Sequence, residues 1–353
     1  MKQLLAYCLS IILCVSFTGC MENYLDLYPE DKITSASFPE NESDIKLLLN
    51  GVYAQLREKE VYNQGLFGFG ITDGATPNAF NWGTDEVFNK LGAGRLSSSD
   101  GGVVTYRWKR CYEIISRANY LLACMDLVDL SEEAKAKYSG ETHFLRGLAY
   151  SVLAETYGGV PIILTNISTE EARSLKRASL EETWQQALDD YEVAITNLGV
   201  DAPEPGRATK GAALGMKMRA YLYQGKYKEV LSCVEQIDAL KKYGLFHSYE
   251  GLFDPANENN KEVLFDIQYI EGENSQGSYI DQYCGTGTGS WTRGSRYVPT
   301  DDLVAAYETI DGSPVDPENP YENRDPRLGF TAVLPGSYFL GYRFPNYLYP
   351  GGA

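Results

Sequence analysis

Apolar residues recur every three or four positions over several long stretches of the chain, which is the pattern of a helix with one buried face. The first stretch covers residues 42–58. Its apolar side chains form one stripe: Ile45, Leu48, Leu49, Val52, Tyr53 and Leu56. We therefore expect a helix there that packs this stripe against a core.

Two more helices are predicted between residues 103 and 157. The helical pattern resumes over residues 103–125 and again over residues 131–157, where Gly158, Gly159 and Pro161 end it. The sequence SLEE at residues 179–182 is a capping box, in which a hydroxyl and a carboxylate satisfy free backbone N–H groups reciprocally. It predicts a further helix that ends near Gly199.

A pair of helices is expected at residues 208–224 and 226–240, on either side of a break at Gly225. The sequence AYLYQGKY at residues 220–227, which spans this break, is similar to tetratricopeptide repeats. In those repeats large side chains fill gaps between antiparallel helices. The repeats are degenerate, so the pattern indicates stacked helical hairpins rather than a regular array. The fold class expected is mainly α, with residues 42–243 as a mostly helical scaffold.

The helical pattern fades after residue 243. EVLFDIQY at residues 262–269 predicts a short strand, and Thr300 with the two following aspartates predicts the cap of a short helix that runs to Tyr307. From Asp311 onwards, prolines and glycines predict a loop. Two long excursions, residues 60–102 and 271–299, are rich in glycine and lack a helical period.

The N-terminus has the form of a secretory leader. Lys2 precedes an apolar run of 14 residues, Leu4 to Phe17, which is too short for a spanning helix of about 20 residues. Cys20 follows this run after two small residues. The sequence FTGC at residues 17–20 is similar to a bacterial lipobox with phenylalanine in place of the usual leucine. We expect a signal peptide at residues 1–19, a lipid on Cys20 and one domain over residues 20–353. Ordinary signal-peptidase cleavage, with Cys20 unmodified, is the alternative.

Charge and cysteine content exclude several classes of protein. Removal of the leader, whose only charged side chain is Lys2, changes the formal net charge from −17 to −18, which disfavours nucleic acid as a partner. The chain has no second long apolar run, so only the lipid is expected to hold it at a membrane. Cys111 and Cys124 on one helix would lie about 20 Å apart, beyond disulfide reach. With two histidines, a histidine-rich zinc site is excluded and no cofactor is expected.

Several short motifs together resemble the SusD/RagB family of outer-membrane nutrient-binding lipoproteins of Bacteroidetes. They occur in the family's order behind the lipobox: YLD at 24–26, LNGVY at 49–53, ETHFLRGLAY at 141–150, YGGVP at 157–161, GRATKGAA at 206–213, EVLF at 262–265, PTDDL at 299–303 and NRDPRL at 323–328. The resemblance implies a scaffold of four tetratricopeptide-like units with a loop-rich ligand-binding side. It also implies a surface-exposed, non-catalytic lipoprotein that captures oligosaccharides, or peptides in some members, for a SusC-like TonB-dependent transporter. Family members usually continue further, so we expect this chain to be truncated at its C-terminus.

The two glycine-rich excursions supply the candidate ligand residues. A sugar site needs exposed aromatic platforms together with planar amides, carboxylates or guanidinium groups. Both tryptophans of the loops lie off any apolar stripe, and local packing of the loop is the alternative role for each. The carbohydrate-binding candidates are Asp73, Asn81, Trp82, Tyr283, Trp291 and Arg293.

Two other functions compete with glycan capture. Peptide capture would suit an extended helical surface, and the acidic charge would favour basic peptides. A glycoside hydrolase needs two carboxyl groups that face each other across a cleft. The adjacent pairs at residues 132–133 and 189–190 are expected on solvated helix faces and diverge by about 100°. His143 is expected to be structural, and GTGTG at residues 285–289 a flexible loop.

Overall fold

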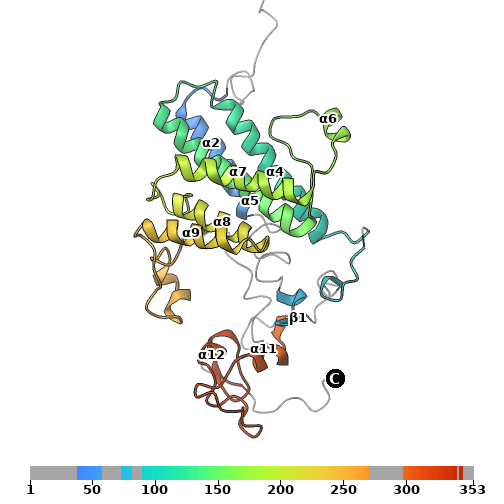
Figure 1. Ribbon diagram of the computed structural model, residues 1–353, viewed down its shortest axis with the longest axis vertical. Helices are drawn as coiled ribbons and strands as arrows, with labels where there is room; N and C mark the ends of the chain where they lie inside the picture. Colours follow the sequence, from blue (N-terminus) through green and yellow to red (C-terminus); the bar gives the residue numbers. More distant parts are fainter. Residues whose placement is uncertain are drawn as a thin grey trace, which may run out of the picture.

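The computed structural model describes residues 38–57, 73–81, 90–97, 99–269, 297–339 and 342–344. Most helices stack in one body, coloured blue to yellow in Figure 1. We call these helices the helical body: α2 (Glu42–Tyr53), α4 (Val103–Cys124), α5 (Glu132–Tyr157), α7 (Leu180–Asn197), α8 (Lys210–Tyr223) and α9 (Tyr227–Ala239). Each helix of this series packs on the next, as α2 on α4, α4 on α5 and so on to α8 on α9. The expected stack of helical hairpins is confirmed.

Shorter elements complete the described chain. They are the helices η1 (Ala54–Arg57), α6 (Thr169–Ser174), η3 (Gly251–Phe253), η4 (Pro255–Asn257), α11 (Asp301–Ala306) and α12 (Arg327–Thr331), and the strands β1 (Ala79–Asn81), β2 (Tyr297–Pro299), β3 (Tyr338–Phe339) and β4 (Tyr342–Arg343). We call residues 297–339, drawn in orange to red in Figure 1, the C-terminal lobe. Within the described residues, no helix is long and apolar enough to cross a membrane.

Helix boundaries follow local sequence signals. The capping box at residues 179–182 is present: Ser179 Oγ accepts from the Glu182 backbone N–H, and the Glu182 carboxylate accepts from the Ser179 N–H. Gly158 ends α5 with a φ of 75°, a conformation that costs glycine little. Thr300 caps α11 as predicted, because its hydroxyl accepts from the Leu303 N–H. Helix α6 has a second capping box, at Ser168, which the sequence analysis did not single out.

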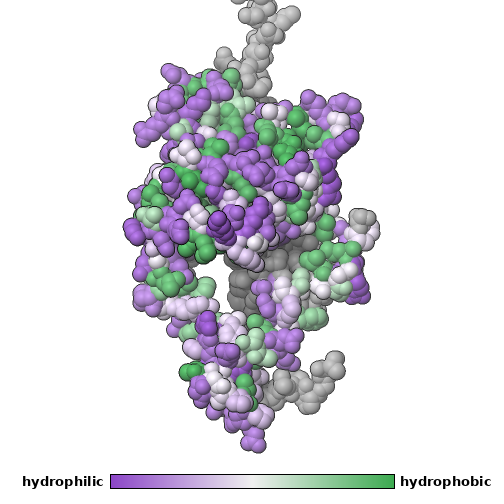
Figure 2. Space-filling model, viewed as in Figure 1, coloured by the Kyte–Doolittle hydropathy of each residue, from purple (hydrophilic) through white to green (hydrophobic). Residues whose placement is uncertain are grey.

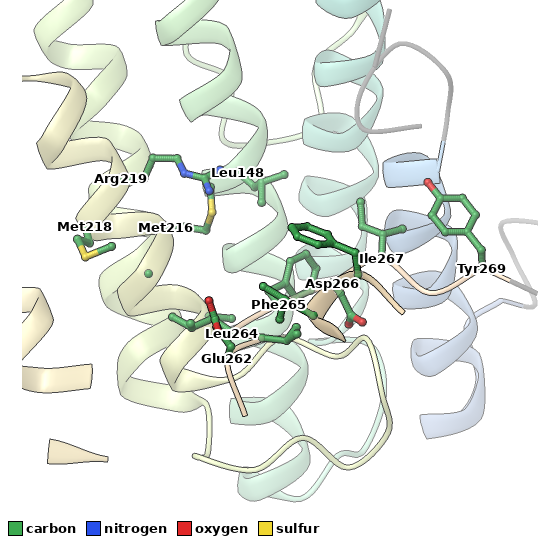
Figure 3. A pocket seen from close by; sticks show the side chains of 15 residues that line it. Leu148, Met216, Met218, Arg219, Glu262, Leu264, Phe265, Asp266, Ile267 and Tyr269 are labelled. Atoms are coloured by element: carbon green, nitrogen blue, oxygen red, sulfur yellow. The ribbon is translucent and has the colours of Figure 1, made fainter. Parts of the chain in front are cut away.

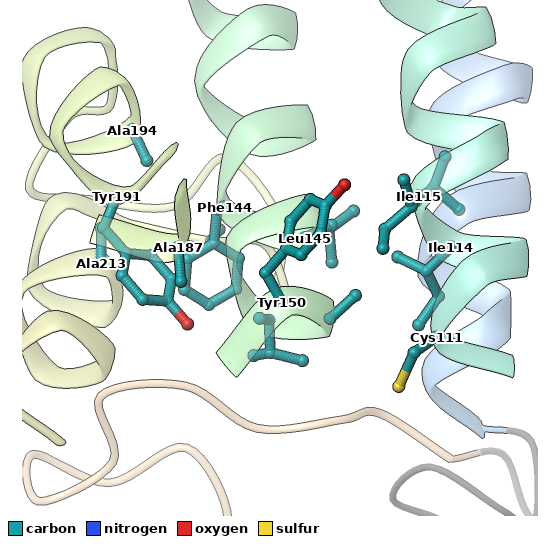
Figure 4. Packing of buried hydrophobic residues seen from close by; sticks show 14 of the residues in the cluster. Cys111, Ile114, Ile115, Phe144, Leu145, Tyr150, Ala187, Tyr191, Ala194 and Ala213 are labelled. Carbon is teal, nitrogen blue, oxygen red and sulfur yellow. The ribbon is translucent and has the colours of Figure 1, made fainter. Parts of the chain in front are cut away.

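The core lies between α4, α5 and α7. Phe144, Tyr150 and Tyr191 are fully buried there, and Figure 4 shows their rings between the helices. At Gly147 the helices α5 and α7 come close together: a Cβ would stand 3.0 Å from the Tyr191 ring and 3.1 Å from the Ala187 carbonyl oxygen. Cys111, Cys124 and Cys233 are free and buried, which confirms the first two as unpaired.

A buried ion pair corrects one expectation. Asp190 was expected on a solvated helix face, yet it is only 1% exposed, while its neighbour Asp189 is exposed. The Arg146 guanidinium on α5 donates to both Asp190 carboxylate oxygens, at 2.7 and 3.0 Å, and to Asn119 Oδ1 on α4 at 2.8 Å. A buried carboxylate requires such a partner, and the sequence pattern does not show that the partner of Asp190 lies on another helix, α5.

Two expectations for the second half of the chain were wrong. Residues 262–269 are not a strand: the segment begins in a turn, bends at Leu264 and has no strand partner among the described residues. They are held instead by side chains, and the Phe265 ring lies 4.9 Å from the Phe144 ring. The region after Asp311 is also not only loop, because it contains α12 and the β3–β4 hairpin.

Candidate functional site

Strands β1 and β2 join the two excursions that were expected to bind ligand. They pair antiparallel, with Ala79 opposite Pro299, Phe80 opposite Val298 and Asn81 opposite Tyr297. We call this pair the strand ribbon. More than 200 residues separate the two strands in sequence, so the sequence patterns alone could not pair them. The ribbon lies below the helical body in Figure 1, beside α11.

Thr300 fastens the segment before β1 to the C-terminal lobe. Its backbone N–H donates to the Asn78 carbonyl at 3.0 Å, and its hydroxyl donates to the Pro77 carbonyl. The same hydroxyl accepts from the Leu303 N–H at 3.2 Å. One side chain therefore both begins α11 and holds the first excursion.

The structure describes only two of the candidate ligand residues. Asp73 is exposed and begins a tight turn, in which its carbonyl accepts from the Thr76 N–H and hydroxyl at 2.9 and 2.8 Å. Asn81 is the last residue of β1. Trp82, Tyr283, Trp291, Arg293 and the lipid-attachment residue Cys20 lie outside the described residues.

Phe80 is a candidate that the sequence analysis missed. It lies in the middle of β1, and 52% of its surface is exposed. Phe80 pairs with Val298, and cross-strand partners lie on the same face of a ribbon. The signal in the sequence was a single aromatic residue inside a polar, glycine-rich loop, which is a weak sign without the strand.

A polar turn closes the first excursion just before α4. Lys90 Nζ donates to Asp100 Oδ1 at 2.8 Å, and the Ser97 N–H donates to Asp100 Oδ2 at 2.7 Å. The hydrogen bond from Lys90, followed by those from Ser97, lowers the pKa of Asp100 from 3.8 to about 2. The turn holds its shape through charge-assisted hydrogen bonds rather than through burial.

Three of the family-like motifs meet in a buried junction of the helical body. Tyr53 on α2 donates to the Glu141 carboxylate on α5 at 2.7 Å and accepts from the Ala208 N–H at 2.9 Å. Arg207 lies over the Tyr53 ring, and its Nη1 is 3.5 Å from the Glu141 carboxylate. Burial raises the pKa of Glu141, and the Tyr53 hydroxyl and the Arg207 charge oppose that shift. These motif residues therefore fasten helices together.

A mainly apolar cavity of about 720 Å³ lies between α8 and residues 262–269, as Figure 3 shows. Met216, Met218, Phe253 and Leu264 are among its lining residues.

Within the part of the chain that the structure describes, no cluster of histidine, cysteine, aspartate and glutamate side chains could hold a metal ion. The Nδ1–H of His143 donates to the Ser139 carbonyl oxygen on its own helix at 2.8 Å, and burial lowers the pKa of its ring.

Comparison with family models identifies the family. A model described as "Starch-binding associating with outer membrane" matches residues 23–222, and a model described as "SusD family" matches residues 261–350. The chain belongs to the SusD/RagB family. This agrees with its fold of helical hairpins and with the junction that the motif residues build.

Relatives of known sequence are longer than this chain. SusD-like protein P25 of Formosa agariphila is 26% identical over 84% of this chain and 58% of its own length. A SusD-like protein of Bacteroides ovatus is 23% identical over 72% of this chain and 48% of its own length. The chain therefore spans about half to three-fifths of these curated relatives.

Solved structures share the fold. A SusD-like carbohydrate-binding protein from Bacteroides fragilis superposes with a TM-score of 0.75 and 28% identity, over 86% of this chain and 61% of that protein. A laminarin-binding SusD-like protein gives a TM-score of 0.59 and 21% identity, over 73% of this chain and 55% of that protein. At 21% identity, the match to the laminarin-binding protein shows a shared fold and nothing more.

Proposed function

We propose that this chain is a non-catalytic glycan-binding lipoprotein, which captures oligosaccharides at the cell surface and passes them to a SusC-like TonB-dependent outer-membrane transporter. The observation that carries the proposal is the strand ribbon. It brings together two excursions, each of which contains a tryptophan and planar hydrogen-bonding side chains, in a chain of the SusD/RagB family.

The chemistry of the excursions suits a sugar. Sugar rings offer flat C–H faces that stack on aromatic side chains, and hydroxyl groups that pair with amides, carboxylates and guanidinium groups. Trp82 follows Asn81 directly in the sequence, and Trp291 precedes Tyr297 by six residues. The exposed Phe80 adds an aromatic ring on the ribbon itself. We assign these residues, with Asp73, Tyr283 and Arg293, to the ligand surface.

The placement at a membrane follows from Cys20 and from charge. A formal charge of −18 after removal of the leader, −17 less the charge of Lys2, gives the protein little attraction to anionic lipid, so a covalent lipid is the anchor that the sequence offers. The carbohydrate-binding relative from Bacteroides fragilis and the family description of outer-membrane association support this arrangement. A Cys20→Ala protein is expected to fold and to bind ligand but to leave the outer-membrane fraction.

Titration calorimetry with a panel of soluble polysaccharides, laminarin included, tests glycan binding. Replacement of Trp82 or Trp291 by alanine is expected to weaken binding about tenfold, the value of one aromatic stacking contact. The matched control is Tyr227→Ala on α9, because Tyr227 is an aromatic residue that is 67% exposed and lies far from the ribbon in sequence. Absence of binding to every polysaccharide overturns the proposal, and release of reducing sugar by the pure protein overturns its non-catalytic part.

A further inference from the structure

Three exposed aromatic side chains from two distant parts of the chain meet at one place. The Tyr249 and Phe253 ring centroids are 5.6 Å apart, and the Phe330 ring of α12 lies 6.1 Å from that of Tyr249. Their exposed fractions are 48% for Tyr249, 71% for Phe253 and 50% for Phe330. We call these three residues the aromatic patch. Single exposed apolar residues are normal on a protein surface, whereas a group of them marks a binding surface.

The turn that carries Tyr249 and Phe253 is held by its own hydrogen bonds. The Ser248 hydroxyl accepts from the Gly251 N–H at 3.0 Å, and Asn257 Nδ2 donates to the Gly251 carbonyl at 2.7 Å. These bonds fix the backbone between the two rings. Because the rings are already in position, binding requires little further ordering of the turn.

Helix α12 presents Phe330 on a similarly fixed base. Leu328 is 1% exposed and anchors the helix, while Arg327, Phe330 and Thr331 are exposed. The hydroxyls of Thr331 and Tyr307 share a hydrogen bond of 2.8 Å, which ties α12 to the end of α11. Residues three positions apart lie on the same side of a helix, so Arg327 is a neighbour of Phe330.

A planar ion pair borders the aromatic patch. Arg327 Nε donates to the two Asp325 carboxylate oxygens at 2.9 and 3.0 Å, and Nη2 donates to the same carboxylate. The hydrogen bond with Asp325 and then its charge raise the pKa of Arg327, and the nearby Tyr249 raises it further. The Arg327 side chain is 60% exposed, and its Nη1 has no hydrogen-bond partner among the described residues. This edge of the guanidinium can donate to a ligand oxygen.

The size and polarity of the aromatic patch favour a sugar over a protein partner. An aromatic side chain has about 150–250 Å² of surface, so the exposed parts of the three rings offer about 350 Å². A specific protein interface buries about 800 Å² on each partner, and charged residues are depleted at its centre. One sugar ring instead needs a single aromatic platform with a planar hydrogen-bonding group beside it.

We propose that the aromatic patch and Arg327 form a second glycan-binding site, which stacks a sugar ring of a neutral polysaccharide on the aromatic side chains and binds its hydroxyls through Arg327. The inference rests on the proposed glycan capture but adds a site apart from the strand ribbon. In Figure 1, α12 lies on the other side of α11 from the ribbon. The two sites therefore hold different sugars of one chain, and two linked contacts bind a long glycan more tightly than either alone.

Affinity electrophoresis of the full chain tests the second site, in gels that contain laminarin, amylopectin, xyloglucan or galactomannan. Phe253→Ala and Phe330→Ala are each expected to raise the dissociation constant for the retained polysaccharide about fivefold, the value of one stacking contact. Tyr227→Ala is the matched control, because Tyr227 is 67% exposed but belongs to α9, and it should leave retention unchanged.

Two further variants separate direct contact from an effect on the ribbon. Arg327→Lys keeps the charge but loses the planar fork, so it should weaken retention about threefold. In a protein that already carries Trp82→Ala and Trp291→Ala, Phe253→Ala should still lower the retention that remains. If the aromatic patch acted only through the ribbon, this last substitution would change nothing.

The possible failures of the two proposals look different. Retention of the unaltered protein, with equal retention of the Phe253 and Phe330 variants, overturns the second site and leaves the proposed function in place. Absence of retention in all four gels overturns both. Dimers of the unaltered protein in size-exclusion chromatography that the Phe253 variant no longer forms would make the aromatic patch an interface between copies of the chain, and would also overturn the second site.

Discussion

The helical body and the C-terminal lobe are held together in different ways. Every residue of the large buried cluster, from Ile45 to Ala220, belongs to the helical body or its connections. In the described part of the lobe only Leu328 and Ala332 are buried apolar residues. The lobe relies on hydrogen bonds instead: Arg324 donates to the carbonyl oxygens of Pro320, Val304 and Tyr307 at 2.5–2.6 Å.

This contrast bears on where ligand surfaces can lie. The helical body gains most of its stability from buried apolar area, and its closely packed core tolerates few substitutions. The strand ribbon and the lobe depend on local polar contacts, so they should open at lower free energy. Figure 2 shows mostly hydrophilic residues on the visible face of the molecule, with hydrophobic residues in small groups. Ligand surfaces in such a protein can vary without loss of the scaffold.

The largest expected effect is the loss of the buried ion pair of the helical body. Asp190→Ala leaves the Arg146 charge buried without its carboxylate, at a cost of about 3–5 kcal/mol in the free energy of unfolding. Urea denaturation followed by circular dichroism measures it. Asp189→Ala is the matched control, because that neighbour is exposed, and it should change stability by less than about 0.5 kcal/mol. Equal effects of the two substitutions would contradict the buried pair.

The next effect should be confined to the lobe. Arg324→Ala removes three hydrogen bonds to carbonyl oxygens, worth about 2 kcal/mol of local stability. Limited proteolysis should cut faster within residues 300–327, while the urea transition of the helical body stays in place. Arg173→Ala, on an exposed pair of α6, serves as the control. A shift of the whole transition would show that body and lobe unfold as one unit.

A smaller effect should appear at the strand ribbon. Thr300→Val keeps the backbone bond to Asn78 but removes the hydroxyl contacts with Pro77 and Leu303, which costs about 1 kcal/mol. Hydrogen exchange should become faster at residues 79–81 and 297–299. Thr196→Val on α7 also removes a hydroxyl contact, to the Glu192 carbonyl, and should not change exchange in the ribbon. Unchanged exchange in the Thr300 variant would show that the strand pairing alone holds the ribbon.

The smallest effect should come from acid. The pKa values of three carboxyl groups are lowered from 3.8 to about 2. The main cause in each case is a hydrogen bond: from Lys90 to Asp100, from Ser313 to Asp311 and from Arg327 to Asp325. A carboxylate with a lowered pKa stabilises the fold above its ordinary pKa, and this contribution is lost as the pH falls towards the folded-state value. Between pH 4 and pH 2 the lobe and the turn before α4 should therefore loosen before the helical body does. Exchange of backbone amides across this range measures the order, and simultaneous loosening would contradict it.

The helices could be predicted from sequence because their signals are local. The apolar stripe of α2, the capping box of α7 and the cap of α11 each involve residues within one or two turns, and all three are present. Residues 262–269 show the limit of such signals. Alternating apolar residues predict a strand, but a strand is defined by its partner, and here the apolar side chains pack against helices instead.

The candidate site was predictable only as two regions of sequence. Composition indicated ligand excursions at residues 60–102 and 271–299, but their pairing through β1 and β2 depends on contacts across more than 200 residues. Phe80 became a candidate only because it lies in strand β1 with its side chain exposed. Family-like motifs likewise marked Tyr53, Glu141 and Arg207 as special without showing that they meet in one buried junction.

By itself the sequence determined the local and bulk properties of this protein: the positions of the helices of the helical body, its acidic charge, the separation of Cys111 from Cys124 and its resemblance to the SusD/RagB family. Periodicity, capping and charge act over a few residues or over the whole composition, so they can be read directly. Tertiary structure alone decided that Asp190 is buried against Arg146, that β1 and β2 form one ribbon, and that Phe265 packs against Phe144. Each of these features depends on a partner far away in the chain, which only the folded backbone brings into contact.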